Sequence, residues 1–145
     1  MPYFFYNDIR KKVIGLNRWR EYNPNPQGKS VGDCVIRALT AATGESWERM
    51  YMFLTFEGFC RADWGNANHV WGRVLRQRGF KRGLVRDDCE TCYTVKDFAE
   101  EHPNGVYVLA TDGHVVCVKD GGFYFDSWDS GGEVPLYFWY KEDDA

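Results

Sequence analysis

The chain has 145 residues, which is enough for one domain with a sizeable hydrophobic core. Hydrophobic residues make up 44% of it and aromatic residues 17%, more than a disordered chain carries. The formal net charge of -3 argues against nucleic-acid binding as the function of the whole chain. We therefore expect residues 1–145 to form a single domain.

The start of the chain, Met1 to Asp8, lacks the basic segment followed by a long apolar run that a signal peptide requires. No stretch of the sequence is long enough to span a bilayer. We therefore expect a cytoplasmic protein that makes no contact with a membrane. The five cysteines, an odd number, are expected to be reduced there and to form no disulfide framework.

Helices are predicted for the first two-thirds of the chain. A possible short strand at 3–6 and an extended, proline-containing loop at 23–28 come before them. Serine or threonine caps, helical spacing of apolar residues and closing glycines then indicate the helices, with an irregular segment at 57–68. Their expected ranges are about 33–43, 46–54, 68–78 and 94–102.

Strands are predicted for the last third, at 106–110, 114–119, 123–126 and 134–140, and turns that contain glycine separate them. Helices followed by an antiparallel meander indicate an α+β fold, with N-terminal helices packed on a C-terminal antiparallel sheet. Alternation along the second strand places His114 on one face with two valines. We expect this face to meet the start of the first helix.

Cys34 follows a tight turn, Gly32-Asp33, at the expected start of the first helix. The free N–H groups and the positive dipole end of a helix start favour the thiolate form of such a cysteine. If the expected face of the sheet meets this helix, His114 can reach Cys34, and Asp126 on the next strand can hold the histidine ring. Asp129 is the alternative acid. No metal or cofactor is expected at this site.

These motifs resemble those of papain-fold cysteine peptidases. Gly32-Asp33-Cys34 opening a helix and Gly113-His114 opening a strand are most similar to the bacteriocin-processing, double-glycine peptidase type. Asp126-Ser127-Trp128 is similar to the Asn-Ser-Trp of papain. The resemblance covers about residues 23–140 and implies a papain-like fold, catalytic roles for Cys34, His114 and Asp126, and a tryptophan, Trp128, that shields the histidine from water.

The resemblance also implies a side-chain amide in the oxyanion hole, beside the backbone N–H of Cys34. Gln27 lies close to the family position but not on it, and Asn25 and Asn23 compete for the role. Val35 replaces the small residue that often follows the nucleophile. These departures leave the identity of the oxyanion side chain open.

Other features carry weaker signals. Cys89-Glu90-Thr91-Cys92 has the spacing of half a zinc site, with only Cys60 or His69 outside the predicted triad to complete it, so free thiols are the simpler interpretation. His69 and His102 are assigned no role. Residues 71–86 contain six basic residues and no acidic one, which indicates a solvated face or a docking site for an acidic partner.

The function predicted from these residues is a cysteine hydrolase that cleaves a peptide or isopeptide bond of a peptide or protein substrate through a thioester. The same three side chains also serve acyl transfer to an amine. A further alternative is a binding or effector protein, possibly encoded by a phage, that keeps a papain-like fold without turnover.

Overall fold

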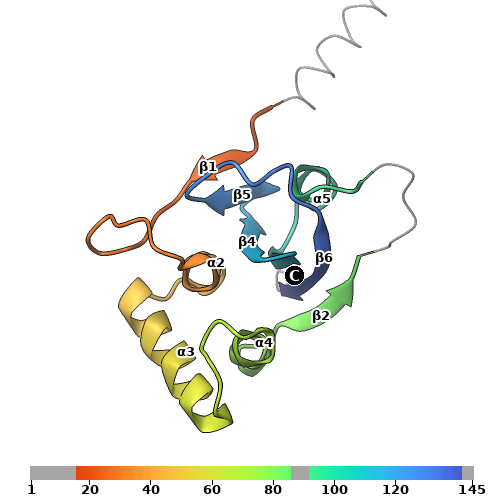
Figure 1. The fold of residues 1–145 in the computed structure, drawn as a ribbon. Coiled ribbons are helices and arrows are strands. Elements are labelled where there is room, and N and C mark those ends of the chain that lie inside the picture. The colour runs from red at the N-terminus through yellow and green to blue at the C-terminus, as the bar shows by residue number, and fades with distance from the viewer. Residues whose placement is uncertain (1–15, 86–91, 142–145) are drawn as a thin grey trace, which may run out of the picture.

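The computed structural model describes residues 16–85 and 92–141 (Figure 1). The predictions at residues 3–6, Arg86 and Cys89 lie outside this part of the chain. The helices are α2 (Cys34–Thr43), α3 (Trp47–Arg61), α4 (Asn68–Gln77) and α5 (Val95–Glu101). The strands are β1 (Trp19–Glu21), β2 (Lys81–Leu84), β3 (Val106–Thr111), β4 (His114–Lys119), β5 (Phe123–Asp126) and β6 (Pro135–Lys141). The α+β class is confirmed.

The described strands form a six-stranded mixed sheet in the order β1-β5-β4-β3-β6-β2. β1 runs parallel to β5, and the other neighbouring pairs are antiparallel. The predicted meander is therefore wrong in two respects. β6 pairs with the central strand β3 and not with β5, and two strands from outside the C-terminal third complete the sheet. β1 and β2 are short and mostly exposed, so their sequences carry no apolar alternation.

Helices cover both faces of the sheet (Figure 1). On one face, α2 packs on β4 and β3, and Val115 and Cys117 join Leu39 in the larger hydrophobic core. On the other face, α5 covers Val116 and Val118. The prediction that the face of Val116 and Val118 meets the first helix is therefore wrong. The residues of β4 are buried on both faces, so alternation alone could not tell which face α2 covers.

Local signals fixed most helix ends as predicted. α2 ends at Gly44, whose φ of 78° is the left-handed conformation that glycine adopts readily. α5 begins with a capping box between Thr94 and Asp97. α3 is longer than the predicted 46–54. It continues through Gly58 to Arg61, into the segment that was predicted to be irregular. A Cβ at Gly58 would lie 2.6 Å from the backbone oxygen of Asp63, so this glycine lets the following turn fold back.

Candidate active site

The predicted site residues lie together, each at the end of a helix or strand. Cys34 is the first residue of α2, His114 is the first residue of β4, and Asp126 is the last residue of β5. β4 and β5 are antiparallel neighbours, so the start of one strand lies beside the end of the other. α2 packs against both strands, and its N-terminus meets them at this end of the sheet. His114 thus approaches Cys34 from the end of its strand.

A hydrogen bond joins His114 to Asp126, with 2.6 Å between Nε2 of the ring and Oδ2 of the carboxylate. Nδ1 is the other ring nitrogen and remains for the thiol, and Cys34 and His114 lie close enough for each to shift the pKa of the other. The backbone N–H of Val115, the residue after the histidine, also lowers the pKa of the thiol. The thiol, the imidazole and the carboxylate therefore lie next to one another in this order.

Asp126 is fully buried, and every hydrogen bond to its carboxylate comes from a donor on another residue. Oδ2 accepts from His114 and from the Ser130 hydroxyl, each at 2.6 Å. Oδ1 accepts from Arg37 Nε at 3.0 Å and from the backbone N–H of Ser127 at 2.8 Å. A buried carboxylate with four donors is held in one orientation and in its charged form.

Arg37 belongs to this cluster, although the sequence analysis assigned it no role. Its guanidinium is buried between two carboxylates, with Nε on Asp126 and Nη1 on Asp33 at 2.9 Å. Asp33 also accepts from the Trp47 indole at 2.9 Å. An arginine four residues after an acid at a helix start is the signal that could have indicated this ion pair, but only the packing of α2 shows that the pair is buried.

The contacts shift the pKa values of all three groups toward an ion pair. Burial alone would raise the pKa of the Cys34 thiol, but His114, the Val115 N–H and the charge of Arg37 together bring it below its ordinary value. Burial would lower the pKa of His114, but hydrogen bonds and attraction from Asp126 and Cys34 raise it to about 9. Burial acts against ionisation of Asp126 as well, yet its donors hold the pKa of this carboxyl below its usual range. At neutral pH these shifts favour thiolate beside imidazolium.

The first N–H groups of α2 receive no side-chain cap. Asp33 occupies the N-cap position, where an aspartate usually accepts from the first turn, but its carboxylate binds Arg37 and Trp47 instead. Gly44 and the α2 carbonyl of Thr40 close the other end of this helix. Backbone N–H donors are thus available at Cys34 for a developing negative charge.

No hydrogen bond within the described residues joins Cys34 to Gln27, Asn25 or Asn23. Gln27 is exposed at the turn of the loop between β1 and α2, which projects from the molecule in Figure 1. Asn25 accepts from the backbone N–H groups of Gln27 and Lys29, and the amide of Asn23 donates to the Lys29 carbonyl. These two asparagines shape the loop, and the oxyanion role of Gln27 stays a prediction.

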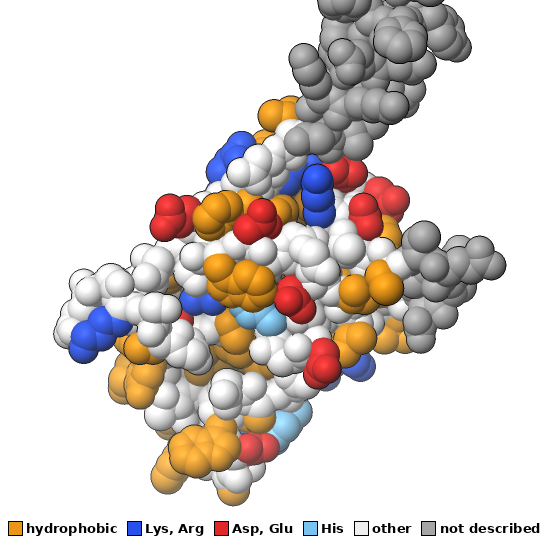
Figure 2. Space-filling model, turned by 45° about the horizontal axis from the view of Figure 1, so that its top comes forward, with side chains coloured by type: hydrophobic (Ala, Val, Ile, Leu, Met, Phe, Trp, Pro, Cys, Tyr) orange, Lys and Arg blue, Asp and Glu red, His pale blue; other side chains and the backbone are white. Residues whose placement is uncertain are grey.

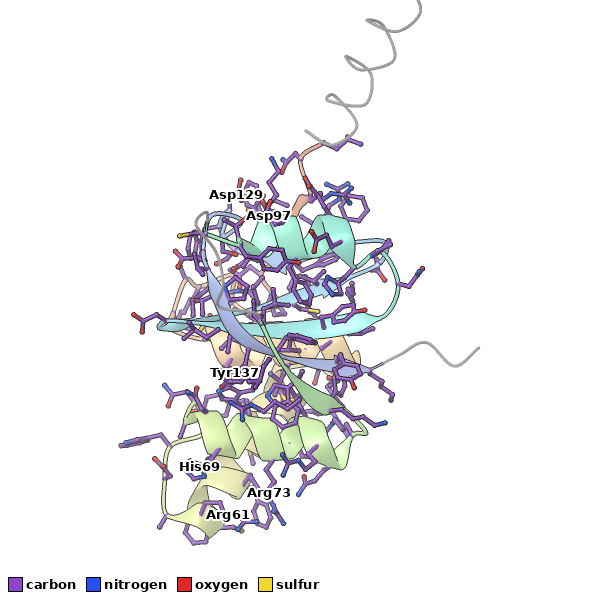
Figure 3. All side chains as sticks on the ribbon, turned by 90° about the vertical axis from the view of Figure 1, so that its right-hand side faces the viewer. Arg61, His69, Arg73, Asp97, Asp129 and Tyr137 are labelled. Carbon is purple, nitrogen blue, oxygen red and sulfur yellow. The ribbon has the colours of Figure 1, made fainter. Side chains whose placement is uncertain are left out.

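Trp128 and Asp129 occupy different places. The Trp128 ring lies beside His114, with 4.9 Å between ring centroids, and is partly exposed. Asp129 accepts hydrogen bonds from the Tyr124 hydroxyl and the Gly131 N–H. Figure 3 shows Asp129 on the α5 side of the molecule. Asp126, and not Asp129, is therefore the acid that contacts His114.

A groove of about 630 Å³ lies between the start of α2 and α3, and its lining residues Asp33 and Val35 flank Cys34, which does not itself line it. Gly32, Asp33, Val35 and Ile36 line one side of it, and residues of α3 and the turn after it line the other. Several of these are hydrophobic side chains with large exposed fractions, and Figure 2 shows hydrophobic side chains gathered over the α3 end of the molecule. On the α3 side they are Tyr51, Phe59 and Trp64.

The other described cysteines differ from Cys34. Cys117 is buried on β4, and burial raises the pKa of its thiol to about 12, so it is an inert core residue. Cys60 and Cys92 are exposed and unpaired. Across residues 16–85 and 92–141, no cluster of three or more His, Cys, Asp or Glu side chains could hold a metal ion. In the same residues, no helix has the length and apolar character needed to cross a membrane.

Comparison with protein-family models, with curated proteins and with solved structures found no match to this chain.

Proposed function

We propose that this protein is a papain-like cysteine hydrolase that cleaves a peptide or isopeptide bond through a thioester. One observation supports this more than any other: at a helix start and two strand ends, Cys34 interacts with His114, and His114 is hydrogen-bonded to Asp126. The order of these residues along the sequence and their local structures also agree with the resemblance to papain-fold peptidases.

In the proposed reaction, the Cys34 thiolate attacks the substrate carbonyl carbon and forms a tetrahedral oxyanion. The proton on His114 passes to the leaving amine, and the carbon–nitrogen bond breaks to leave a thioester. His114 then takes a proton from water, whose oxygen attacks the thioester and releases the acid and the thiol. Asp126 holds the ring and stabilises its charged form throughout.

The oxyanion is expected to bind to backbone N–H groups at the start of α2, which have no side-chain cap. Gln27 is the side-chain candidate that the resemblance implies, and it would act only if the loop at 23–28 folds over the helix start. A Gln27→Ala variant tests this directly. A loss of about 100-fold in acylation rate supports the role, and an unchanged rate leaves the backbone groups alone in it.

The groove between the start of α2 and α3 is the expected substrate site, because two of its lining residues, Asp33 and Val35, flank Cys34. Its exposed aromatic residues on α3 and the following turn would contact an apolar side chain of the substrate, close to the cleaved bond. Trp64 is 80% exposed and Phe59 is 83% exposed, so both can gain contacts with a bound peptide. We therefore expect peptides with a large apolar residue near the scissile bond to react best.

Acylation by p-nitrophenyl acetate tests the proposal without knowledge of the natural substrate. The Cys34 thiolate should displace p-nitrophenolate, gain one acetyl group that mass spectrometry can locate, and lose it to water in repeated turnovers. Cys34→Ala should abolish turnover, while Cys60→Ala, which removes an exposed thiol elsewhere, should not change it. Acetylation of Cys34 at the same rate in a His114→Ala protein would contradict the proposal.

The same assay separates the two alternatives. An acyltransferase that uses this site would turn over faster when a primary amine is added, because the amine competes with water for the thioester. A binding protein without turnover would leave Cys34 unacetylated. The second alternative has one observation in its favour, since no side-chain amide is hydrogen-bonded to Cys34 within the described residues.

A further inference from the structure

A second groove, of about 420 Å³, lies away from Cys34 between α4, β2 and β6. We call it the arginine groove and define it by Arg61 of α3, Arg73 and Arg76 of α4, Arg82 of β2, and Tyr137 and Trp139 of β6. Figure 3 shows Tyr137 next to α4 and Arg61 below it on α3. Gly72 allows this close packing, because a Cβ there would lie 2.8 Å from the Trp139 ring.

The groove carries more positive charge than its own acids neutralise. Arg61 and Arg73 share a single carboxylate, Glu57, at 3.2 and 2.9 Å. Arg76 and Arg82 form no ion pair with any described residue. Their guanidiniums lie over aromatic rings, Arg76 at 5.3 Å from the centroid of Trp139 and Arg82 at 4.4 Å from that of Tyr137. His69, which lines the groove, pairs with Asp63 of the turn after α3.

The aromatic rings support the arginines and are not free to bind bases. Trp139 is only 5% exposed. Tyr137 has Arg82 over its ring and also stacks with Trp71, at 6.1 Å between centroids and 8° between planes. A guanidinium stacked on a ring keeps its in-plane N–H donors for carboxylate or phosphate oxygens. The groove therefore presents donors for oxyanions without an open stacking platform, which single-stranded nucleic acid needs.

We propose that the arginine groove binds a short acidic segment of a protein partner. Two guanidiniums without carboxylate partners suit the side chains of consecutive glutamates or aspartates, and the groove holds a few residues. The chain has 21 acidic and 18 basic residues, so its overall charge opposes a long polyanion while a short segment meets only the local field. This inference is independent of the proposed chemistry at Cys34.

Binding of a hexaglutamate peptide to the full chain, measured by calorimetry at about 20 mM salt, tests the proposal. We expect binding that weakens at about 200 mM salt, because exposed charges are screened. Arg76→Gln and Arg82→Gln should each weaken it about fivefold. Glu57→Gln should strengthen it, because it removes the carboxylate that neutralises Arg61 and Arg73.

Arg20→Gln is the matched control. Arg20 is exposed, lies 4.1 Å from the Phe123 ring centroid and forms no ion pair with the described residues, so the variant removes the same charge from the same type of contact outside the groove. Affinity for hexaglutamate should not change in it. Equal losses in Arg20→Gln and Arg76→Gln, or no binding at low salt, would overturn the proposal. Tighter, groove-dependent binding of hexathymidylate than of hexaglutamate would overturn it in favour of nucleic acid.

The two proposals fail separately in these experiments. Arg76→Gln should acetylate at Cys34 as fast as the parent protein, because Arg76 lies on α4 and Cys34 at the start of α2. A protein that binds hexaglutamate but is not acetylated would keep the acidic partner and lose the hydrolase. A protein that is acetylated but does not bind hexaglutamate would support the hydrolase and overturn the acidic partner.

Discussion

The two charged regions of this molecule use arginine in opposite ways. Arg37, at the sheet end, is buried between two carboxylates and orders groups that belong to the chain itself. Arg76 and Arg82, in the arginine groove, are exposed and rest on aromatic rings without a carboxylate partner among the described residues. Internal pairing fixes a geometry, which a reaction needs, whereas unpaired charge at a surface remains available to another molecule.

The largest expected effect comes from removing Arg37. Arg37→Met would leave the buried carboxylates of Asp126 and Asp33 without their cation, and we expect the free energy of unfolding to fall by about 3 kcal/mol. Urea unfolding of the full chain measures this. Arg49→Met is the matched control, because Arg49 also pairs with an acid four residues away but is exposed, and it should cost less than about 0.5 kcal/mol. Equal losses would contradict the role of burial.

His114→Ala should slow alkylation of Cys34 by iodoacetamide at pH 7 on the order of 100-fold. The ring holds the pKa of Cys34 down, and without it the burial of the thiol raises that pKa. The pH at which labelling reaches half its maximum should therefore move upward in the variant. A His102→Ala protein is the control, since His102 stacks on Phe98 at the end of α5.

Asp126→Asn should slow the same alkylation by about tenfold, less than the loss of the histidine, because the acid acts through the ring. Each carboxylate oxygen of Asp126 accepts hydrogen bonds from two donors. The NH2 group of an asparagine is itself a donor, so in place of either oxygen it would face two donors and accept from neither. The pKa of His114, now about 9, should fall. NMR titration of the ring would show it, and an unchanged pKa would contradict the coupling.

The pH dependence of stability should follow the three groups of the site. His114 has a raised pKa in the folded protein, so its own contribution to the free energy of unfolding is complete below about pH 6.5 and is lost as the pH rises through about 9. Cys34 has a lowered pKa, so its contribution grows as the pH rises toward about 9 and offsets the loss from His114. Asp126 has a lowered pKa, so its contribution is complete above about pH 4 and is lost in acid. Urea unfolding of the parent protein should therefore show the acid loss but little net change between about pH 6.5 and 9, and Cys34→Ala, which removes the offset, should uncover the alkaline loss.

Arg76→Gln should have the smallest effects. Its guanidinium is exposed and without an ion pair among the described residues, so we expect a change of less than about 0.5 kcal/mol in the free energy of unfolding and no change in Cys34 alkylation. Urea unfolding and alkylation at pH 7 measure both. A loss as large as that of Arg37→Met would mean that the groove stabilises the fold and is not a free surface.

The sequence could predict this site where local structure carries the information. The turn before Cys34 marks a helix start, and the strands that begin with His114 and end with Asp126 follow from apolar runs between glycine turns. It could not place Arg37 and Ser130 on Asp126, because those contacts depend on how α2 meets β5 and the loop after it. The face of β4 that α2 covers was predicted wrongly for the same reason.

The rate of iodoacetamide alkylation at each cysteine, measured at pH 7 by mass spectrometry of the folded protein, tests the central claim most directly. We expect Cys34 to react faster than the exposed Cys60 and Cys92, although it is less exposed than either, and we expect His114→Ala to remove this advantage. Faster labelling of Cys60, Cys89 or Cys92 than of Cys34, or a Cys34 rate that does not depend on His114, would contradict it.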